Sequence, residues 1–311
     1  MRILIVGGTR FIGVYLTRIL VKQGHDVVLL NRGNHGLPDG VSHIKGDRTD
    51  PQHLVEKLKG ENFDAVFDNI GRELKDTQPL VDLFRGRIQQ FIYMSSAGVY
   101  QFSDQLPHGE DDPIDPKSRH FGKGETEQYL IRQGIPFTSI RPTYIYGPKN
   151  YNPIESWFFD RILHNRPIPI PGNGVYITQL GHVQDLAQAM VQVLGNPKAV
   201  GQIYNVSGDR YVTFDGLAKA CAIAAGHSVN AMELVHYDTK KINFGSRKGF
   251  PLREQHFFTS IQKAKDELNW QPQFNLISGL TDSFQTDYLP SGRADMKLDF
   301  SLDEEILAMV P

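Results

Sequence analysis

The sequence predicts an α/β fold: a doubly wound parallel sheet followed by a smaller C-terminal lobe of the substrate-binding type. Strand-like apolar runs alternate with helix-like segments through about residue 150, and a glycine-rich segment separates the first strand from the first helix. Strands that alternate with helices form right-handed crossovers, which place helices on both faces of a parallel sheet. After about Gly147 the alternation gives way to proline-rich turns, which marks the second lobe.

The elements follow in order from the spacing of apolar residues. Short β-branched and apolar runs predict strands at residues 2–6, 27–30, 65–67, 91–94 and 138–140. Helical spacing predicts helices at residues 11–23, 51–59, 77–84 and 123–133. These belong to a first domain, residues 1–150, to which residues 181–207 return with a helix at 183–194 and a strand at 203–206. Residues 151–180 and 208–290 form the smaller lobe, with helices at 154–163, 213–225, 260–268 and 277–288, and residues 291–311 form a surface arm.

Composition excludes several classes of protein. The 311 residues include 33 Lys and Arg and 35 Asp and Glu, and 40% are hydrophobic, which is ordinary for a globular chain and excludes a mostly disordered one. A net charge of −2 means that nucleic acid can bind only through a local basic patch. The single cysteine, Cys221, excludes an internal disulfide and a thiolate metal cluster. No apolar run reaches membrane-spanning length and the first residues already form a strand, so we expect no membrane contact and no targeting segment.

The segment between the first strand and the first helix predicts a dinucleotide site in a Rossmann-like fold. Glycine at the end of the strand lets the backbone approach a pyrophosphate, which rests on the N-terminal amides of the helix. Gly13 allows that helix to pack closely on the sheet. The middle glycine of the usual motif is replaced by an arginine, a cation beside the expected phosphates. The residues expected to contact the dinucleotide here are Gly7, Thr9, Arg10, Phe11, Ile12 and Gly13.

The end of the second strand predicts which dinucleotide is bound. An NAD-selective site carries Asp or Glu there for the ribose hydroxyls, but this chain has Asn31 and Arg32. A guanidinium binds a 2′-phosphate with two hydrogen bonds, so we expect NADP, with NAD left open. The alternative, that Arg32 is only a solvated loop charge, also stays open. Asp47 is placed either to meet the adenine edge or to cap a turn.

Residues 91–100 (FIYMSSAGVY), 141–148 (RPTYIYGP) and 181–186 (GHVQDL), together with the glycine segment, resemble the extended short-chain dehydrogenase/reductase superfamily in its NAD-dependent epimerase/dehydratase branch. The resemblance implies that Ser96 orients a substrate hydroxyl and that Lys123 holds the nicotinamide ribose. It also implies an acid/base tyrosine four residues before the lysine, but that position is Arg119, followed by His120. A guanidinium does not exchange protons near neutral pH, so we expect ordinary hydride chemistry to be absent or very weak.

A narrower resemblance accounts for this departure. Residues 67–73, 115–123, 150–153, 157–161, 211–219 and 255–258 resemble the chloroplast stem-loop-binding proteins, most closely those of the b type. This implies RNA binding, association with ribosomal or transcription complexes, and a homo-oligomer or a hetero-oligomer with an a-type relative. It also implies a cyanobacterial cytoplasm or, for a mature plastid form, the chloroplast stroma. Relatives of the a type are described as metal-dependent endoribonucleases, so Mg²⁺ enters only if this chain cleaves RNA.

One basic segment could bind RNA on its own chemistry. Residues 238–258 carry five cations against two carboxylates, with phenylalanines interleaved, and cations neutralise phosphates while aromatic rings stack on unpaired bases. The alternative is a solvated face over a hydrophobic core, which we expect for Phe257 and Phe258. The histidines form no metal-binding pattern, so no metal site is expected. The RNA-binding candidates are Lys240, Lys241, Arg247, Lys248 and Arg253, extended by Arg161 and Arg166.

The sequence therefore favours a reductase-fold protein that has a dinucleotide pocket and a degenerate active site and that binds RNA. Whether it cleaves RNA stays open. Two alternatives remain. One is an NADP-dependent oxidoreductase or sugar-nucleotide epimerase/dehydratase, which Ser96, Lys123 and the intact glycine segment favour. The other is a scaffold whose nucleotide site serves stability or redox sensing only.

Overall fold

The computed structural model describes residues 1–310, and the chain forms two compact units. Unit 1 comprises Met1–Thr143, Val183–Ser207 and Thr259–Gln271. Unit 2 comprises Tyr144–His182, Gly208–Phe258 and the residues from Pro272 onward. Each unit has its own hydrophobic core, so each is described by itself.

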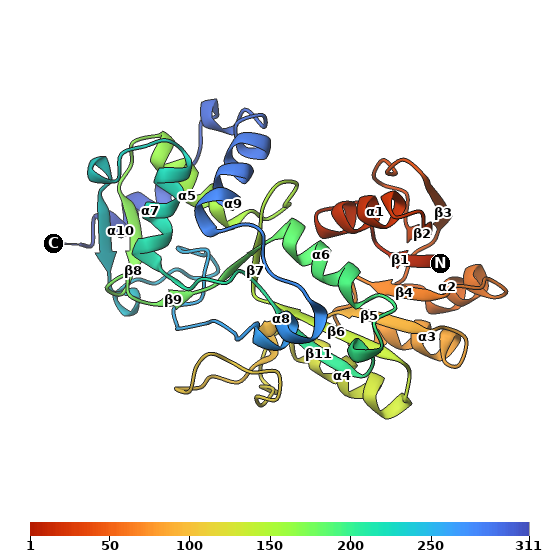
Figure 1. The fold of residues 1–311 in the computed structure, drawn as a ribbon. Coiled ribbons are helices and arrows are strands. Elements are labelled where there is room, and N and C mark those ends of the chain that lie inside the picture. Colours follow the sequence, from red (N-terminus) through yellow and green to blue (C-terminus); the bar gives the residue numbers. More distant parts are fainter. Residues whose placement is uncertain (311) are drawn as a thin grey trace. The chain divides into compact units, whose positions relative to one another are not determined.

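Unit 1 is built on a seven-stranded sheet in the order β11-β6-β5-β4-β1-β2-β3, and every neighbouring pair is parallel. This order, in which the chain winds outward from β1 in both directions, confirms the doubly wound sheet that the sequence predicts. Figure 1 shows the sheet at the centre of the unit. The strands are β1 (Arg2–Val6), β2 (Asp26–Asn31), β3 (Val41–Lys45), β4 (Ala65–Asp68), β5 (Gln90–Met94), β6 (Phe137–Pro142) and β11 (Gln202–Val206).

Helices cover both faces of this sheet (Figure 1). One face carries α1 (Ile12–Lys22) and α6 (Val183–Val193), and the other carries α2 (Pro51–Leu58), α3 (Leu74–Phe84) and α4 (Phe121–Gln133). The buried residues of α1 recur at helical spacing, which turns one apolar stripe toward the sheet. The central strands are buried on both sides and therefore consist of continuous apolar runs.

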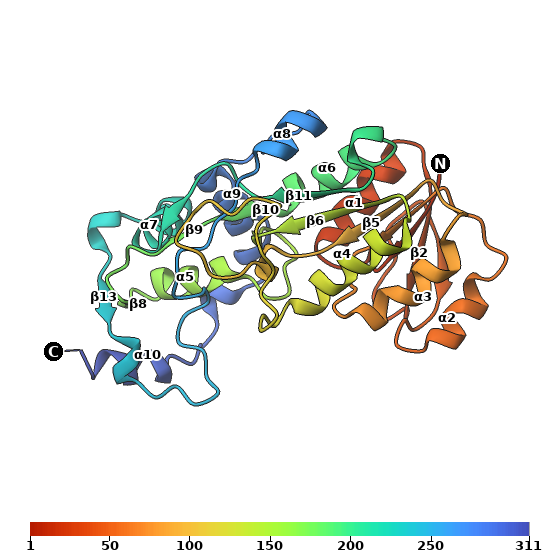
Figure 2. The same ribbon diagram turned by 90° about the horizontal axis from the view of Figure 1, so that it is seen from below.

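The connectivity brings the functional segments together at one edge of the sheet. Because the strands are parallel, their carboxyl ends lie on the same side, where ligands bind in open α/β sheets. The residues that follow β1, β4 and β5 are Gly7, Asn69 and Ser95, and β2 ends at Asn31. In the view of Figure 2 the strands of unit 1 run side by side toward this edge.

The prediction that residues 260–268 belong to the smaller lobe is wrong. The helix there, α8 (Gln262–Leu268), groups with unit 1. It packs on β11, where Lys263 Nζ donates to the Gln202 side chain and the Tyr204 hydroxyl donates to Glu267. Its amphipathic pattern indicates a helix but does not say which core receives it. Residues 144–150, assigned to the first domain from the sequence, likewise group with unit 2.

Unit 2 combines helices with three two-stranded sheets, β10-β7, β12-β9 and β13-β8. Its core is rich in aromatic residues, among them Phe158, Phe159 and Phe214. The helices are α5 (Ile154–Leu163), α7 (Phe214–Ala224), α9 (Leu276–Ser283), which continues as a π-helical turn at Phe284–Tyr288, and α10 (Ser301–Leu307). The strands are β7 (Tyr144–Tyr146), β8 (Ile168–Pro171), β9 (Ile177–Thr178), β10 (Leu180–His182), β12 (Val212–Thr213) and β13 (Leu234–Tyr237).

The C-terminal residues also differ from the prediction of a surface arm. Ile306 of α10 is fully buried and packs in a cluster with Tyr237 and Ile242. Figure 2 shows α10 close to β8 and β13. The three acidic residues that predicted an exposed tail lie on this packed helix. The prediction failed because it relied on the charges and not on the apolar residue that follows them.

Candidate functional site

The glycine segment takes up the close-packed turn that a dinucleotide site requires. Gly7 and Gly8 have φ angles of 109° and 93°, which an L-residue rarely adopts. A Cβ atom on Gly13 would lie 2.6 Å from the Cα atom of Gly8, so only glycine lets α1 begin against this turn. Phe11, directly before α1, has a φ of 43°, and no side chain caps the helix. The amides of Gly13 and Val14, in the first turn of α1, donate to the carbonyl oxygens of Arg10 and Phe11 at 3.0 Å, so the backbone itself closes this turn.

Beside this turn lies a buried amide group without a hydrogen-bond partner. Both polar side-chain atoms of Asn69 are buried and unpaired among the described residues. The Asn69 Cβ atom would lie 3.8 Å from a Cβ atom built on Gly7, which places the amide next to the glycine segment. Burying an amide without a partner costs free energy, and a bound ligand with polar groups can supply that partner.

The end of β2 is fixed by hydrogen bonds and leaves Arg32 exposed. The Asn31 side chain accepts from the Gly33 amide at 2.8 Å and lies 3.2 Å from His43 Nε2, so its orientation is set within the protein. Asp47 accepts from both the amide and the hydroxyl of Thr49. These hydrogen bonds, and more weakly the charge of Arg32, lower the pKa of Asp47. The structure thus brings Arg32 near Asp47 at the edge where an adenine ribose is expected.

Lys123 on α4 reaches the loop after β4 and the end of β5. Its Nζ donates to the carbonyl oxygens of Gly71 at 3.0 Å and Met94 at 2.5 Å. Burial disfavours the ammonium charge and lowers the pKa of Lys123 to about 8. The ammonium therefore stands at the carboxyl edge of the sheet, where the resemblance requires it.

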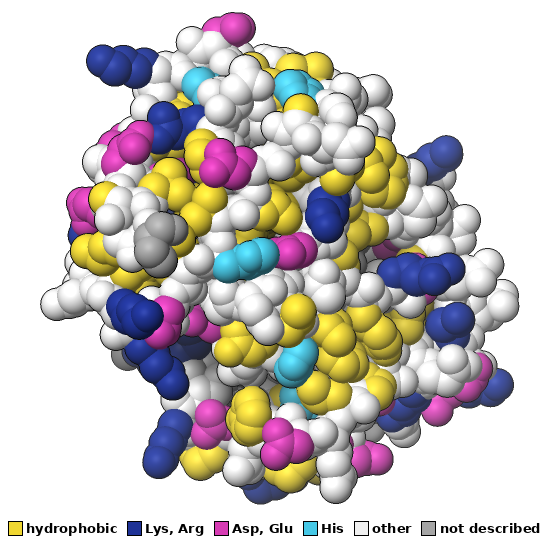
Figure 3. Space-filling model, turned by 90° about the vertical axis from the view of Figure 1, so that its left-hand side faces the viewer, with side chains coloured by type: hydrophobic (Ala, Val, Ile, Leu, Met, Phe, Trp, Pro, Cys, Tyr) yellow, Lys and Arg dark blue, Asp and Glu magenta, His cyan; other side chains and the backbone are white. Residues whose placement is uncertain are grey.

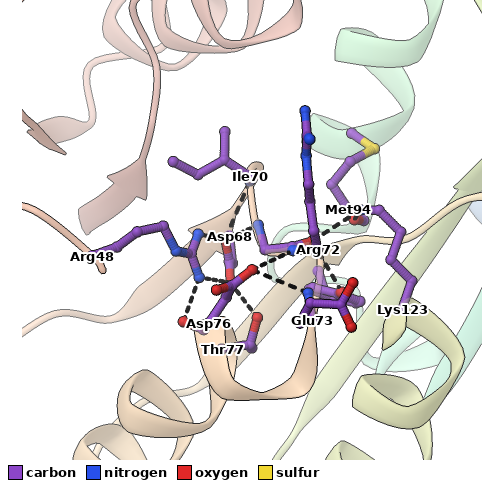
Figure 4. A network of polar contacts seen from close by, with 11 residues as sticks. Arg48, Asp68, Ile70, Arg72, Glu73, Asp76, Thr77, Met94 and Lys123 are labelled. Carbon is purple, nitrogen blue, oxygen red and sulfur yellow. Dashed lines mark hydrogen bonds and ion pairs between the residues drawn. The ribbon is translucent and has the colours of Figure 1, made fainter. Parts of the chain in front are cut away.

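A buried ion pair that sequence reasoning missed supports this edge. Two nitrogens of Arg48 lie 2.6 and 2.9 Å from the two carboxylate oxygens of Asp68. Asp68 also accepts from the Thr77 hydroxyl and from the amides of Ile70 and Gly71, which fold the loop after β4. Figure 4 shows Arg48 on one side of this loop and Lys123 on the other.

The electrostatics of this pair are favourable despite its burial. Burial opposes both charges, but the partner's charge and the hydrogen bonds outweigh it, so the pKa of Arg48 is raised and that of Asp68 is lowered. The only sequence signal was that Asp68 lies within a family-specific run, which does not identify its partner 20 residues away.

The acid/base position of the family is occupied by Arg119, which lies beside His120. Arg119 is exposed, and its Nε atom lies 3.1 Å from His120 Nε2. Ser96 caps the short 3-10 helix η1 (Ala97–Val99), because its hydroxyl oxygen accepts from the Gly98 amide at 3.0 Å. Tyr100, which follows η1, is buried and donates to Asn205 at 2.7 Å. Burial raises the pKa of Tyr100, which makes it a poor acid near neutral pH.

The RNA-binding candidates all lie in unit 2, but they do not form a uniform basic face. Lys240 and Lys241 form part of the 3-10 helix η4 (Thr239–Lys241) and are exposed. Lys248 donates to the carbonyl of Pro251, and Arg253 lies over the ring of Phe257. Phe257 is buried, which confirms its expected place in the core. Figure 3 shows basic and acidic side chains interspersed on the face of the molecule that it displays.

Three of the proposed cations already bind carboxylates of α10. Arg247 makes two contacts with Glu305, at 2.8 and 2.7 Å. Arg161 pairs with Asp303 and Arg166 with Glu304. The expectation that Arg161 and Arg166 extend an open basic face is therefore wrong for this conformation, because residues more than 130 positions later neutralise them.

Within residues 1–310, no group of three or more His, Cys, Asp or Glu side chains is arranged to hold a metal ion. Over the same residues, no helix is both long and apolar enough to cross a membrane.

Comparison with known proteins identifies the family. A model of the NAD dependent epimerase/dehydratase family matches residues 3–207. The chain belongs to this family. It is also 50% identical, over 99% of its length and 84% of the relative's, to the chloroplast stem-loop binding protein of 41 kDa b from Arabidopsis thaliana. This identity confirms the narrower resemblance. The long family-specific runs were a more specific signal than the single glycine motif.

More distant epimerase/dehydratase family members share the fold. A putative UDP-glucose 4-epimerase from Methanocaldococcus jannaschii is 25% identical over 89% of this chain and 95% of its own. The solved UDP-glucose 4-epimerase from Thermotoga maritima, in a structure with UDP-glucose, has a TM-score of 0.78 at 20% identity and covers 94% of this chain and 99% of its own. The dTDP-glucose 4,6-dehydratase from Bacillus anthracis, solved in complex with NAD, has a TM-score of 0.75 at 18% identity over 92% and 96% of the two chains. At this identity the likeness concerns the fold alone.

Proposed function

We propose that this protein binds stem-loop RNA and a dinucleotide, preferentially NADP(H), and that it lacks the acid–base chemistry of catalytic members of its family. The observation that carries the RNA part is the 50% identity, over nearly the whole chain, with a protein named for stem-loop binding. RNA cleavage is no part of this proposal. The relative's name also supports a plastid location. As a further part of the proposal, the protein assembles with RNA-containing complexes and with other copies of itself.

The dinucleotide part is supported by the fit of unit 1 to the ligand. The close-packed turn at Gly7 and Gly8 before α1 suits a pyrophosphate, and the unpaired Asn69 amide lies beside it. Lys123 would hold the nicotinamide ribose, and Arg32 would bind the 2′-phosphate with Asp47 nearby. Arg10, which is exposed in the glycine segment, would add a cation to the phosphate site.

The loss of catalysis is supported by the group that stands in the acid/base position. A guanidinium is not a proton-transfer group, and the phenol of Tyr100 donates to Asn205. A hydride-transfer or epimerisation step needs a group that takes and returns a proton at the substrate hydroxyl. In the family, the lysine at the position of Lys123 activates such a phenol. In this chain position 119 carries a guanidinium in place of the phenol.

The RNA part is tested by titrating the protein against a fluorescently labelled RNA stem-loop at several salt concentrations. Binding should weaken with salt, because each phosphate neutralised by a cation releases condensed counterions. Lys240→Glu combined with Lys241→Glu should weaken binding by about tenfold and flatten the salt dependence, since both lysines are exposed. The matched control is Lys57→Glu with Lys59→Glu, which makes the same charge change at exposed positions at the end of α2 in unit 1. Equal losses in the two double variants would show that net charge, not this face, determines affinity.

A further inference from the structure

The C-terminal residues 297–310 are acidic and pair with cations from separate parts of unit 2. They carry four carboxylates and one lysine. The consecutive residues Asp303, Glu304 and Glu305 each bind a different arginine. These arginines lie on α5, in the loop that follows it, and in the basic segment at residues 238–258: Arg161, Arg166 and Arg247. Three separate cations thus converge on one short helix.

The surface under α10 has the composition of a nucleic-acid-binding site. The guanidinium of Arg161 stacks on Trp157 at 3.5 Å from the ring centre, and Trp157 contacts Phe250 edge-on. Phe244 lies in the cluster that receives Ile306. Arginines beside aromatic rings bind phosphates and stack on bases, whereas a surface meant only for a helix needs apolar residues. Here the carboxylates of α10 bind guanidinium groups, which also bind phosphates.

The ionic contacts of α10 leave several polar atoms unpaired. Among the described residues, Arg161 Nε, Arg166 Nε, Asp303 Oδ2 and the Tyr237 hydroxyl are buried without a hydrogen-bond partner. Burial raises the pKa of Asp303 and lowers that of Arg161, so the pairing does not compensate the loss of water. The Arg48–Asp68 pair in unit 1 shows the opposite directions for both groups. Asp303 is therefore an imperfect partner for Arg161, whereas the exposed pair of Arg247 and Glu305 raises the pKa of Arg247 through their hydrogen bonds.

The apolar anchor of α10 is small. The buried cluster that holds it consists of Ile306, Tyr237 and Ile242, with Leu302, Phe244 and Val310 partly buried around it. A cavity of about 360 Å³ lies beside the cluster, with Lys241 and Ile242 on its wall and Met309 and Val310 of the C-terminal segment also lining it. An anchor with one fully buried side chain can be displaced without unfolding the core of unit 2, which is formed by other residues.

We propose that residues 297–310 form an acidic cover over a phosphate-binding surface of unit 2, and that RNA displaces this segment to reach Arg161, Arg166 and Arg247. This proposal rests on the proposed RNA binding and adds a site and its regulation. Lys240 and Lys241, which are exposed beside the cover, make the first contacts with RNA. The three arginines under α10 become available only when the segment leaves.

The first test removes two of the covering charges and leaves the apolar anchor intact. In Glu304→Gln with Glu305→Gln, the carboxamides keep the size of the side chains, while Asp303 and Ile306 remain. Affinity for the labelled stem-loop should rise by about tenfold at 0.1 M salt, and the salt dependence should steepen by about one to two phosphate contacts, since two cations are freed. Thermal melting checks that the variant is folded.

A matched control separates the cover from net charge. Asp209→Asn with Glu233→Gln removes two negative charges from exposed positions of the same unit that take no part in the ion pairs of α10. Its affinity should change by less than about twofold, because exposed charges at a distance are screened by salt. An equal gain in both double variants overturns the cover. If the wild type binds the stem-loop and Glu304→Gln/Glu305→Gln binds no better, the cover is again wrong while the proposed function stands. If neither protein binds RNA, the proposed function fails and the cover fails with it.

The second test follows the cover in the wild-type protein. Hydrogen exchange of the amides at residues 302–307 should become faster when the stem-loop is added, because displaced helices lose their protection. The amides of α7, in the core of unit 2, should be unaffected. Slower or unchanged exchange of α10 in the presence of saturating RNA shows that RNA does not displace it.

Discussion

The guanidinium of Arg48 and the carboxylate of Asp68 form a two-point ion pair at 2.6 and 2.9 Å, in which the Asp68 side chain is fully buried. Through its other hydrogen bonds, Asp68 also fixes the loop after β4, whose Gly71 carbonyl accepts from Lys123. The pair thus links the edge of the sheet to the residue expected to hold the nicotinamide ribose. This relationship makes Asp68 a positioning residue for the candidate site.

Replacing Asp68 by Asn should destabilise the protein strongly. The substitution keeps the shape but leaves the Arg48 charge buried without a counter-charge, which costs about 3–5 kcal/mol of unfolding free energy. Urea denaturation measures this loss. The control is Asp26→Asn, which breaks the exposed Arg2–Asp26 pair and should cost no more than about 1 kcal/mol. Similar costs at the two positions would contradict the buried pair's role.

The lowered pKa of Lys123 predicts a pH-dependent stability. Its folded pKa of about 8 lies below the usual lysine value of 10.5, so between these pH values the unfolded chain binds more protons and stability rises with pH. In Lys123→Met this contribution is absent. The stability of the wild type relative to Lys123→Met should therefore increase by up to about 3 kcal/mol from pH 7.5 to pH 10.5. Parallel pH profiles of the two proteins in urea denaturation would refute the shift.

Arg32 should determine the choice of dinucleotide. Calorimetry should give tighter binding of NADP(H) than of NAD(H), by about 10- to 100-fold, because a charge-assisted two-point contact to a phosphate is worth about 1.5–3 kcal/mol. Arg32→Asp should reverse the preference by repelling the 2′-phosphate. Arg132→Asp, at an exposed position in the last turn of α4, makes the same charge change and should leave it intact. Equal affinities of the wild type for both dinucleotides would rule this role out.

Turnover should be close to background for UDP-sugars and for hydroxysteroid-like alcohols. Removing general acid–base help lowers rates by about 10²- to 10⁴-fold, so catalysis by the wild type should be severely reduced without vanishing. Arg119→Tyr restores a phenol four residues before Lys123 and should raise any measurable turnover. Arg119→Phe adds the ring without the hydroxyl and serves as the control. Robust epimerase or dehydrogenase activity of the wild type would favour the catalytic alternative instead.

Much of unit 1 could be predicted from local sequence because its determinants are local. Each central strand is a continuous apolar run, since a parallel sheet covered on both faces leaves no polar side. The glycines of the Gly7–Gly13 segment predict its turn, because the backbone approaches so closely that no side chain fits at Gly13. The four-residue spacing of Arg119 and Lys123 likewise needed no tertiary information.

The sequence by itself determined the sheet, the glycine turn and the missing phenol, all of which depend on residues close together in the chain. Tertiary structure alone decided which charges meet. Arg48 pairs with Asp68, 20 residues away, and Arg161 pairs with Asp303, 142 residues away. The local sequence around these arginines does not predict either partner. The same holds for α8, whose apolar spacing predicts a helix but not the core that receives it, and for α10, which the sequence places in a surface arm although Ile306 is buried. An ion pair or a docked helix depends on positions brought together by packing, and packing is a property of the whole fold.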